Sequence, residues 1–543
     1  MVVLSLEILA TSLIHSAEIM VYQEWKHKLT SKVFIHLFHG NEVIRTADNS
    51  SLIWIGLLVL IEIFLAIVLL HSLFFRHRHF KLPFSIVSTT CFFTIWLIEL
   101  GMCFLFARGG IQQIPINIDA SYYSKNFKLN DIAINSSYFL ANSYFLFLNS
   151  DIHKFVPKID SNEARKQVDS LYQKNSSTTD FFLTKASPNI VLVILEGWSS
   201  SALESLEEFE GYDTKFAELK SGGVYFNNIY ATNTTSEIGH TSILGGFPSL
   251  SEVSISNYPE KHRNIPTINQ MLNDNGYTSH YIFGGDTKYG NIESFLVDHG
   301  FDDIVDEDLF PSGLSHGKLS YHDEDVYSYF MELHKHKSTP FFSVIFTGST
   351  HSPYDYPKNN FPKWQGKEKS YMNSLIYAEN ALFHFIENAR NESWYPNTLF
   401  VFVSDHSHSS PKFEIPYEAG FFKIPLLFFG EVIQELKKGT KISTIGSQAD
   451  LPATLLHQLN ISSKKFPFSK NLGDSLAHSF SMLATIRGYG YVNPFGSFTY
   501  HFDSKKFINK TFNENYFSKA KKESDALFRS YYDYYEGLDT KKE

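Results

Sequence analysis

"LFVFVSDHSHSS", residues 399–410, is the stretch that decides the fold class. Six apolar or small residues run directly into Asp405 and His406, and His408 follows two positions later. A strand buried on both faces of a parallel sheet has such an unbroken apolar run, and open α/β sheets bind ligands at the carboxyl ends of their strands. The stretch therefore indicates either metal or phosphate chemistry at a strand end, or a polar turn, because turns favour Asp and Ser.

Similar apolar runs alternate with segments of helical periodicity from Pro188 onward. The runs are "NIVLVILEGW", "GVYFNNIYA", "TSHYIFGGD", "FFSVIFTGSTH", "LFVFVSDH" and "IPLLFFG". The segments between them are "PTINQMLNDNG", "EDVYSYFMELHKH", "SYMNSLIYAENALFHFIENA" and "ADLPATLLHQLN". This alternation is typical of βαβ units. We expect an α/β fold with a mostly parallel central sheet and helices on both faces.

Polar side chains follow four of these predicted strands. Glu196 follows "IVLVIL", Asp286 follows "YIFGG", His351 follows "FFSVIFTGST", and Asp405 with His406 follows "FVFVS". Parallel strands bring these groups to one edge of the sheet. Because all of them can bind metal or phosphate, their convergence predicts a functional site there.

The stretch "ATNTTSEIGHTSILGGFPS", residues 231–249, places hydroxyls between a predicted strand and a predicted helix. A hydroxyl at a helix start usually caps the helix. The same place favours an anionic oxygen, and a serine alkoxide beside a divalent metal would be stabilised there. Capping and nucleophilic roles both stay open for Thr235 and Ser236. A helix that begins at Glu237 would make Ser236 the residue that faces the free N–H groups.

Three further residues are weaker candidates for substrate binding or positioning. His408 lies on the same side as His406 if the strand geometry continues, but it also fits a solvated loop histidine. His322 and Asp323, in "LSYHDED", open a predicted helix, and Asp323 also fits a plain helix-start acid.

Two apolar stretches, residues 51–75 and 84–107, are each long enough to cross a bilayer, which takes about 20 residues. Residues 1–20 are interrupted by charged residues, and we interpret them as a short or incomplete first membrane helix. They lack the basic leading region and the cleavage site of a signal peptide. The basic loop "RHRHFK" between the two long stretches predicts that it faces the cytoplasm, so the chain after Arg108 would lie outside it.

These features predict three regions: a membrane region over 1–107, a membrane-proximal connector over 108–185 and an extracytoplasmic catalytic domain over 186–543. Both cysteines, Cys91 and Cys103, lie in the second long apolar stretch, so disulfides contribute nothing to the exported part. The net charge of −10 argues against a nucleic-acid partner, which would need a basic face.

With these residues in hand, the chain resembles the sulfatase and alkaline-phosphatase superfamily, and within it the membrane-anchored lipoteichoic acid synthase and phosphoglycerol transferase group. The resemblance covers residues 186 to about 500 and is carried by "PNIVLVILEGW", "TTSEIGHTSILGGFP", "FTGSTHSPY" and "VFVSDHSHS". It extends to the preceding apolar stretches and to "ARGGIQQIPIN". It implies that one divalent metal is held by Glu196, a hydroxyl at 235 or 236, Asp405 and His406, and that His351 contacts the substrate phosphate. It also implies manganese, although the mixed ligand set does not distinguish manganese from zinc, magnesium or calcium.

Aligning on "SILGGFP" selects Ser236 as the family nucleophile, and Thr235 stays open because some members show the order Thr-Ser-acid found at 235–237. The chain departs from the lipoteichoic acid synthases after "SHYIF". Where they carry a second substrate histidine followed by glycine, this chain has Gly284, Gly285 and Asp286. This stretch therefore lacks the histidine through which those enzymes bind a glycerol phosphate headgroup.

The resemblance implies an enzyme of the bacterial cytoplasmic membrane that moves a phosphoglycerol-type headgroup from a phospholipid to a glycan, glycolipid or polymer acceptor. The reaction would pass through a covalent Ser or Thr phospho-enzyme. The alternatives are a sulfatase, a phosphodiesterase or phosphoethanolamine transferase, and a non-catalytic scaffold. True sulfatases need Pro and Arg where Ile238 and His240 stand, and the presence of every metal position argues against a scaffold.

Overall fold

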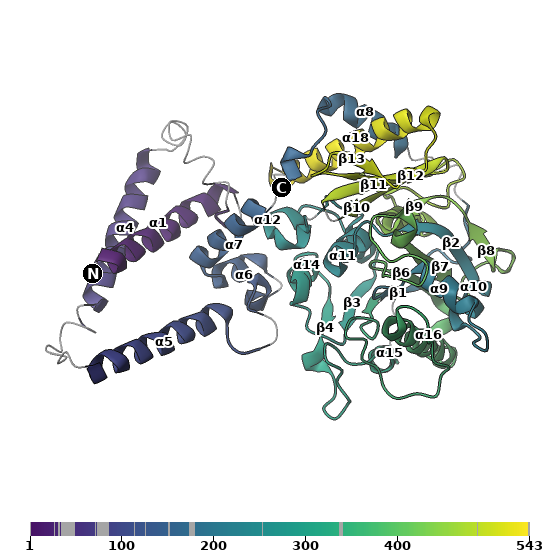
Figure 1. The fold of residues 1–543 in the computed structure, drawn as a ribbon, viewed down its shortest axis with the longest axis horizontal. Coiled ribbons are helices and arrows are strands. Elements are labelled where there is room, and N and C mark those ends of the chain that lie inside the picture. The colour runs from purple at the N-terminus through teal and green to yellow at the C-terminus, as the bar shows by residue number, and fades with distance from the viewer. Residues whose placement is uncertain are drawn as a thin grey trace. The chain divides into compact units, whose positions relative to one another are not determined.

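The protein is described here by a computed structural model, which forms two compact units, Met1–Ser150 and Asp151–Glu543 (Figure 1). The residues that the structure describes are 2–25, 28–30, 33, 49–70, 72, 86–112, 115–124, 126–149, 152–172, 180–251, 253–335, 340–485 and 487–540. The two units divide inside the expected connector 108–185. The three-region division expected from the sequence stays a prediction.

The first unit is helical. Its described helices are α1 (Val2–Trp25), α4 (Asn49–Leu70), α5 (Ile86–Arg108), α6 (Phe127–Ala133) and α7 (Ser136–Asn149). Helix α1 packs against α4 and α7. A buried ion pair joins Lys28 Nζ to Glu18 Oε1 at 2.6 Å, and Lys28 also donates to the carbonyls of Asp131 and Ile134 at 3.0 and 3.1 Å. Through Lys28, these contacts connect Glu18 of α1 to the C-terminal end of α6.

The three stretches expected to enter the membrane coincide with α1, α4 and α5, so their helical structure is confirmed over the described residues. Residues 71, 73–75, 84 and 85 and the basic loop 76–81 lie outside the described residues. Among the helices that the structure describes, none combines the length and the apolar character needed to cross a membrane. The expectation of membrane-spanning helices is therefore not borne out over the described part of the chain.

The second unit is built around a mostly parallel sheet, as the sequence predicts. The strand order is β4-β3-β5-β1-β6-β7-β2-β8, and β9 also pairs with β2. Strand β7 is antiparallel to both of its neighbours, and the other pairs are parallel. The strands are β1 (Asn189–Leu195), β2 (Gly223–Tyr230), β3 (Thr278–Phe283), β4 (Asp303–Val305), β5 (Phe341–Phe346), β6 (Thr398–Ser404), β7 (Lys423–Phe429), β8 (Thr440–Ile442) and β9 (Gly446–Ser447).

Both faces of this sheet are covered, which explains the unbroken apolar runs. Successive side chains of a strand point to opposite faces. On β1, Ile190 and Leu192 pack into one hydrophobic cluster, whereas Val191 and Val193 pack into the other. The first cluster includes residues of α11 (Ser236–Gly245), α13 (Ile268–Asn273), α14 (Ile292–Asp298) and α17 (Leu451–Gln458). The second includes residues of α9 (Ser200–Glu207), α10 (Lys215–Ser221), α15 (Asp323–His334) and α16 (Lys369–Ala389). The short helix α12 (Pro259–His262) precedes α13.

A second, antiparallel sheet follows, which the sequence reasoning did not anticipate. Its order is β10-β11-β12-β13, and its strands are β10 (Ser481–Thr485), β11 (Gly488–Asn493), β12 (Gly496–His501) and β13 (Lys506–Ile508). The helices α18 (Glu514–Gly537) and α8 (Ser161–Leu171) lie against each other beside it (Figure 1). The buried face of α8 is Ala164, Val168 and Leu171, so part of the expected connector is packed into this unit.

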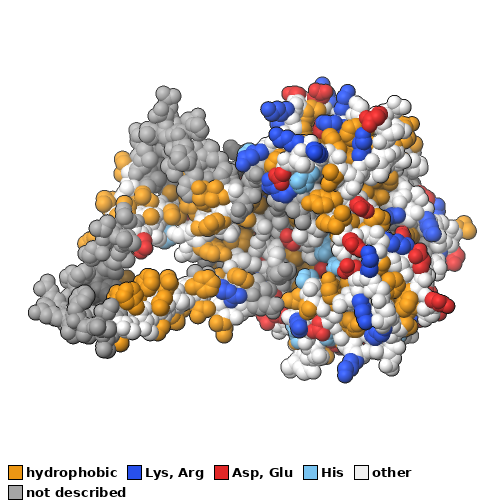
Figure 2. Space-filling model, in the orientation of Figure 1, with side chains coloured by type: hydrophobic (Ala, Val, Ile, Leu, Met, Phe, Trp, Pro, Cys, Tyr) orange, Lys and Arg blue, Asp and Glu red, His pale blue; other side chains and the backbone are white. Residues whose placement is uncertain are grey.

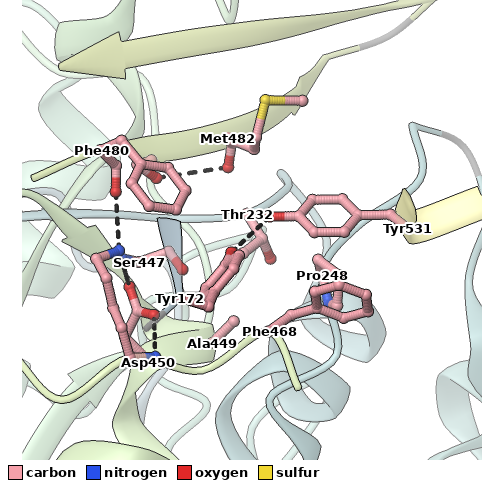
Figure 3. A pocket seen from close by; sticks show the side chains of 12 residues that line it. Tyr172, Thr232, Pro248, Ser447, Ala449, Asp450, Phe468, Phe480, Met482 and Tyr531 are labelled. Carbon is pink, nitrogen blue, oxygen red and sulfur yellow. Dashed lines mark hydrogen bonds and ion pairs between the residues drawn. The ribbon is translucent and has the colours of Figure 1, made fainter. Parts of the chain in front are cut away.

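The two sheets meet around a small buried pocket (Figure 3). The hydroxyls of Tyr172 and Tyr531 lie 2.6 Å apart, and Lys470 Nζ forms a buried ion pair with Asp450 Oδ2 at 2.8 Å. The backbone N–H of Ala484, on β10, donates to the carbonyl of Thr232 at 2.7 Å. Because Thr232 follows β2 and precedes the hydroxyl cluster at 234–236, the second sheet supports the loop that leads to the candidate nucleophile.

Candidate active site

Glu196 and Asp405 lie side by side because their strands do. Strands β1 and β6 are parallel neighbours, and Leu195 pairs with Ser404 in register. The next residue of each strand is therefore a carboxylate at the same edge. His406 Nε2 lies 3.4 Å from Glu196 Oε1 and 3.7 Å from Asp405 Oδ2. One ligand atom from each of the three side chains lies within 4.8 Å of the others, so Glu196, Asp405 and His406 form a group that can hold a metal ion.

Neighbouring backbone groups aim these ligand atoms at one point. Asp405 Oδ1 accepts from the N–H groups of Gly197 and His406 at 2.8 and 2.7 Å. His406 Nδ1 donates to the carbonyl of Ser407 at 2.8 Å, which leaves Nε2 facing the carboxylates. Among the described residues, the buried Asp405 Oδ2 has no hydrogen-bond partner. A buried carboxylate oxygen without a hydrogen bond costs free energy unless it binds a cation or proton, so the donor set fits a divalent metal.

The electrostatics of the three residues are those of a cation site. Burial raises the pKa of Asp405, and the neighbouring Glu196 charge raises it further. Burial is the largest effect on Glu196 and acts to raise its pKa, but the charge and hydrogen bond of His406, the charge of His351 and a hydrogen bond with Asp405 together lower that pKa. Burial acts to lower the pKa of His406, whereas the Asp405 and Glu196 carboxylates raise it. Two carboxylates in one buried place therefore retain a proton on the group, which a divalent ion would displace.

Ser236 lies against this group. Its Oγ donates to Glu196 Oε2 at 3.1 Å, and it is the first residue of α11. The expected helix start at Glu237 is therefore wrong by one residue: Thr235, with an extended backbone, is the residue before the helix, and its side chain makes no capping hydrogen bond. Among the described residues, the buried Thr235 Oγ1 has no hydrogen-bond partner. The contact to Glu196 favours Ser236, and Thr235 stays the neighbouring alternative.

His351 lies in the loop after β5, close enough for its charge to lower the pKa of Glu196. Its Nδ1 lies 2.7 Å from the carbonyl of Ser352. Asp323 supports this loop from the start of α15: its Oδ1 accepts from the N–H groups of Gly348 and Ser349 at 2.9 and 3.0 Å. Asp323 is thus more than a helix-start acid, because it fastens the segment that carries His351.

His408 is held in an aromatic cluster and is not a solvated loop histidine. Its ring stacks on Tyr371 with the centroids 3.9 Å apart, and its Nε2 lies 2.9 Å from Tyr354 OH. Tyr371 OH donates to the carbonyl of Gly197 at 2.8 Å. Burial lowers the pKa of His408. His408 therefore packs against Tyr371, the residue that supports the backbone of Gly197 next to Glu196.

The other two candidates, Asp286 and His322, make contacts outside the ligand group. Asp286 accepts from the N–H of Lys288 at 2.9 Å, in the loop after β3. This loop packs against the first turn of α11, because a Cβ on Gly290 would lie 3.2 Å from Glu237 Cβ. His322 is buried at the start of α15. The described contacts do not join either residue to Glu196, Asp405 or His406.

Sequence reasoning missed three supporting residues. Thr347 Oγ1 accepts from the N–H of Glu196 at 2.9 Å, and Thr350 donates to the Glu196 carbonyl. Both belong to "FTGSTH", where hydroxyls directly after a predicted strand are a usable signal. Gln448 Nε2 donates to the Asp405 carbonyl at 2.6 Å from 43 residues away in the chain, and no local pattern points to it.

The fold and this site define an α/β enzyme with its candidate centre at the carboxyl edge of a parallel sheet. The chain belongs to the sulfatase family: the family model described as Sulfatase matches residues 188–461. It is a sulfatase-superfamily enzyme distantly related to phosphoglycerol transferases and lipoteichoic acid synthases. It is 26% identical over 235 residues to phosphoglycerol transferase I of Xanthomonas campestris pv. campestris, covering 41% of this chain and 33% of the relative. It is 22% identical over 367 residues to the lipoteichoic acid synthase of Staphylococcus saprophyticus, covering 59% and 54%.

Solved structures agree on the fold. A protein in the alkaline phosphatase superfamily from Vibrio parahaemolyticus superposes with a TM-score of 0.60 and 24% identity, covering 71% of this chain and 98% of that one. The lipoteichoic acid synthase LtaP from Listeria monocytogenes superposes with a TM-score of 0.58 and 18% identity, covering 69% and 98%. The alignments cover about a third to a half of the length of the curated relatives.

Proposed function

We propose that the protein is a metal-dependent phosphotransferase that moves a phosphoglycerol-type headgroup from a phospholipid to a glycan, glycolipid or polymer acceptor. One observation carries the proposal. The Ser236 hydroxyl, at the start of a helix, donates to Glu196 beside the group that can hold a metal. A nucleophile and metal ligands within reach of one phosphate suit a displacement at phosphorus.

Each residue has a specific task in this reaction. Glu196 Oε2 accepts a hydrogen bond from the Ser236 hydroxyl and so orients Ser236 Oγ. A bound divalent ion would lower the cost of ionising that hydroxyl, and the free N–H groups of the first turn of α11 favour the resulting negative charge. Ser236 Oγ then forms a bond to phosphorus as the bond to the lipid alcohol breaks, and that alcohol leaves with a proton. The oxygen of an acceptor hydroxyl next forms a bond to phosphorus as the bond between phosphorus and Ser236 Oγ breaks, and the proton of the acceptor hydroxyl passes to Ser236 Oγ. His351 would bind phosphate oxygens.

We propose manganese as the ion, on the family resemblance. Glu196, Asp405 and His406 supply two carboxylates and one imidazole, and Ser236 adds a hydroxyl. Oxygen-rich sites of this kind take manganese or magnesium, and the imidazole also permits zinc. Elemental analysis of the protein purified without chelators tests the choice.

The lipid donor is supported by the apolar surface of the first unit. Hydrophobic side chains gather along α5 (Figure 2), where Phe92, Leu97 and Phe106 are 58%, 60% and 73% exposed. Exposed apolar surface of this extent marks an interaction site, and a bilayer is a partner of matching chemistry. We propose that this unit contacts the outer face of a bacterial cytoplasmic membrane and keeps the active site near its donor.

A sulfatase is the second candidate, because the family model itself is that of sulfatases. His240 stands where the sulfatase motif requires arginine, and it is buried with its Nε2 2.9 Å from Tyr281 OH. Burial there lowers its pKa to about 4, so it carries no charge for a sulfate at neutral pH. The purified enzyme should therefore release diacylglycerol from phosphatidylglycerol and leave p-nitrophenyl sulfate intact. Hydrolysis of the sulfate ester without release of diacylglycerol would overturn the proposal.

A further inference from the structure

A second pocket lies in the same unit, between the antiparallel sheet and α18. It encloses about 180 Å³. Drug-sized ligands occupy pockets of roughly 300–1,000 Å³, so this one suits a ligand about the size of a single sugar ring. Its lining includes His478, Tyr491, Asn493, Phe495, Tyr516 and Glu523. None of these residues belongs to the candidate active site.

Two stacked aromatic rings form one wall of this pocket. The rings of Phe495 and Tyr516 are nearly parallel, at 9°, with their centroids 4.1 Å apart. Nevertheless, Phe495 is 54% exposed and Tyr516 is 41% exposed. The turn that carries Phe495 is fixed, because its N–H donates to Asn493 Oδ1 at 2.9 Å. An aromatic face held in place at the surface is ready to take an apolar ligand face, such as the C–H face of a sugar.

A nearly buried carboxylate, that of Glu523, also lines the pocket. The Glu523 side chain is 11% exposed, and its Oε2 accepts from Tyr491 OH at 2.7 Å. Its Oε1 lies 3.8 Å from the Nζ of Lys519, a side chain that is 79% exposed. An ion pair of this length with one partner largely in solvent is weak. Glu523 therefore offers an acceptor to ligand hydroxyl groups, and its negative charge disfavours phosphate and sulfate.

We propose that this pocket binds an uncharged sugar residue. Its aromatic wall takes the C–H face of the ring, and Glu523 accepts a ring hydroxyl. The proposal does not rest on the proposed function, because sugar binding at this pocket requires no transfer chemistry. If both hold, the pocket would keep a glycan-bearing acceptor on the enzyme.

Saturation-transfer NMR on the full chain in detergent micelles tests the proposal, with the methyl glycosides of glucose, galactose and N-acetylglucosamine as probes. At least one glycoside should bind. Phe495→Ala and Tyr516→Ala should each weaken it more than tenfold without lowering the melting temperature. Phe181→Ala removes an aromatic side chain of similar exposure, 46%, outside the pocket, and should change nothing.

The variant Lys519→Ala tests whether the ligand of this pocket is uncharged or anionic. Sugar binding should stay within twofold of wild type, and inorganic phosphate should not compete. The proposal would be overturned if none of the three glycosides binds, or if Phe495→Ala and Phe181→Ala bind the glycoside equally well. The proposal would equally fail if Lys519→Ala abolished binding in parallel with phosphate competition. Loss of binding to phosphatidylcholine vesicles in Phe495→Ala, without any sugar binding, would assign the rings to the membrane surface instead.

Discussion

Thr235 and Ser236 place two hydroxyls one residue apart at the start of α11, and only Ser236 contacts Glu196. Ser236→Ala should therefore abolish turnover. The free energy of unfolding should fall by about 1.5–3 kcal/mol, the net contribution of a hydrogen bond to a charged group. Ser236→Thr should keep part of the activity, and Thr235→Ala should reduce the rate modestly. Mass spectrometry of the trapped phospho-enzyme checks the assignment. A phosphate on Thr235, with Ser236→Ala still active, would reverse it.

Glu196, Asp405 and His406 should each be needed for metal binding, because removing one leaves an incomplete ligand shell. Alanine at any of the three positions should lower the bound metal to background in elemental analysis. The ligands must also lose their shared proton to bind an ion, so metal affinity should fall as the pH is lowered. His408→Ala, two residues away, is a matched control: it should retain the metal. If all three alanine variants still bound a full complement of metal, the three residues could not be the metal ligands.

At the scale of elements, α11 packs directly against the end of β6. A Cβ on Gly239 would lie 2.3 Å from the Asp405 carbonyl oxygen, a backbone atom that cannot move aside easily. Gly239→Ala should therefore push the helix away from the strand. We expect a loss of about 1–3 kcal/mol in unfolding free energy and weaker metal binding. Gly537→Ala, in α18, is the control, since a Cβ there meets nothing within 4 Å. Equal metal affinity and stability for the two variants would contradict the close packing.

A buried charge cluster joins α12 and its flanking residue to α14. Asp298 Oδ2 lies 2.8 Å from both His262 Nε2 and Arg263 Nε. Burial acts to raise the pKa of Asp298, but His262 and Arg263 outweigh it and lower that pKa. Asp298→Ala should cost about 3 kcal/mol at pH 7. Because the folded pKa is depressed, the stabilisation is present above the unfolded value of about 3.9 and is lost as the pH falls through the folded value. In urea unfolding, the difference in the free energy of unfolding between wild type and Asp298→Ala should therefore become smaller below about pH 4. A difference that does not change with pH would contradict this.

At the scale of the whole molecule, the orientation predicted from the loop "RHRHFK" is open to test. Cys91 and Cys103, both exposed, would be replaced by serine, and Leu436→Cys would add one thiol at a side chain that is 93% exposed. If the second unit lies outside the cytoplasm, a membrane-impermeant maleimide should label this thiol in intact cells. Labelling only after lysis would place the unit inside.

The sequence by itself determined the parallel sheet and the edge at which the site lies. Buried strands must be apolar on both faces, so the runs before Glu196 and Asp405 are visible without coordinates, and the polar residues that end them are conspicuous. The sequence could not determine which of those residues meet. That depends on strand order: β1 and β6 are neighbours, so Glu196 lies beside Asp405 and His406, whereas the loop carrying Asp286 packs against α11.

Only the tertiary structure decided the supporting contacts. Gln448, in the short 3-10 helix before α17, donates to the Asp405 carbonyl, and the N–H of Ala484 on β10 donates to the carbonyl of Thr232. These contacts join segments far apart in the chain, so residue spacing carries no trace of them. For the same reason, the sequence did not predict α8. Its short apolar face is buried only when α18 packs against it. Local patterns record which face of a strand or helix is buried, and the packing of distant segments decides what that face contacts.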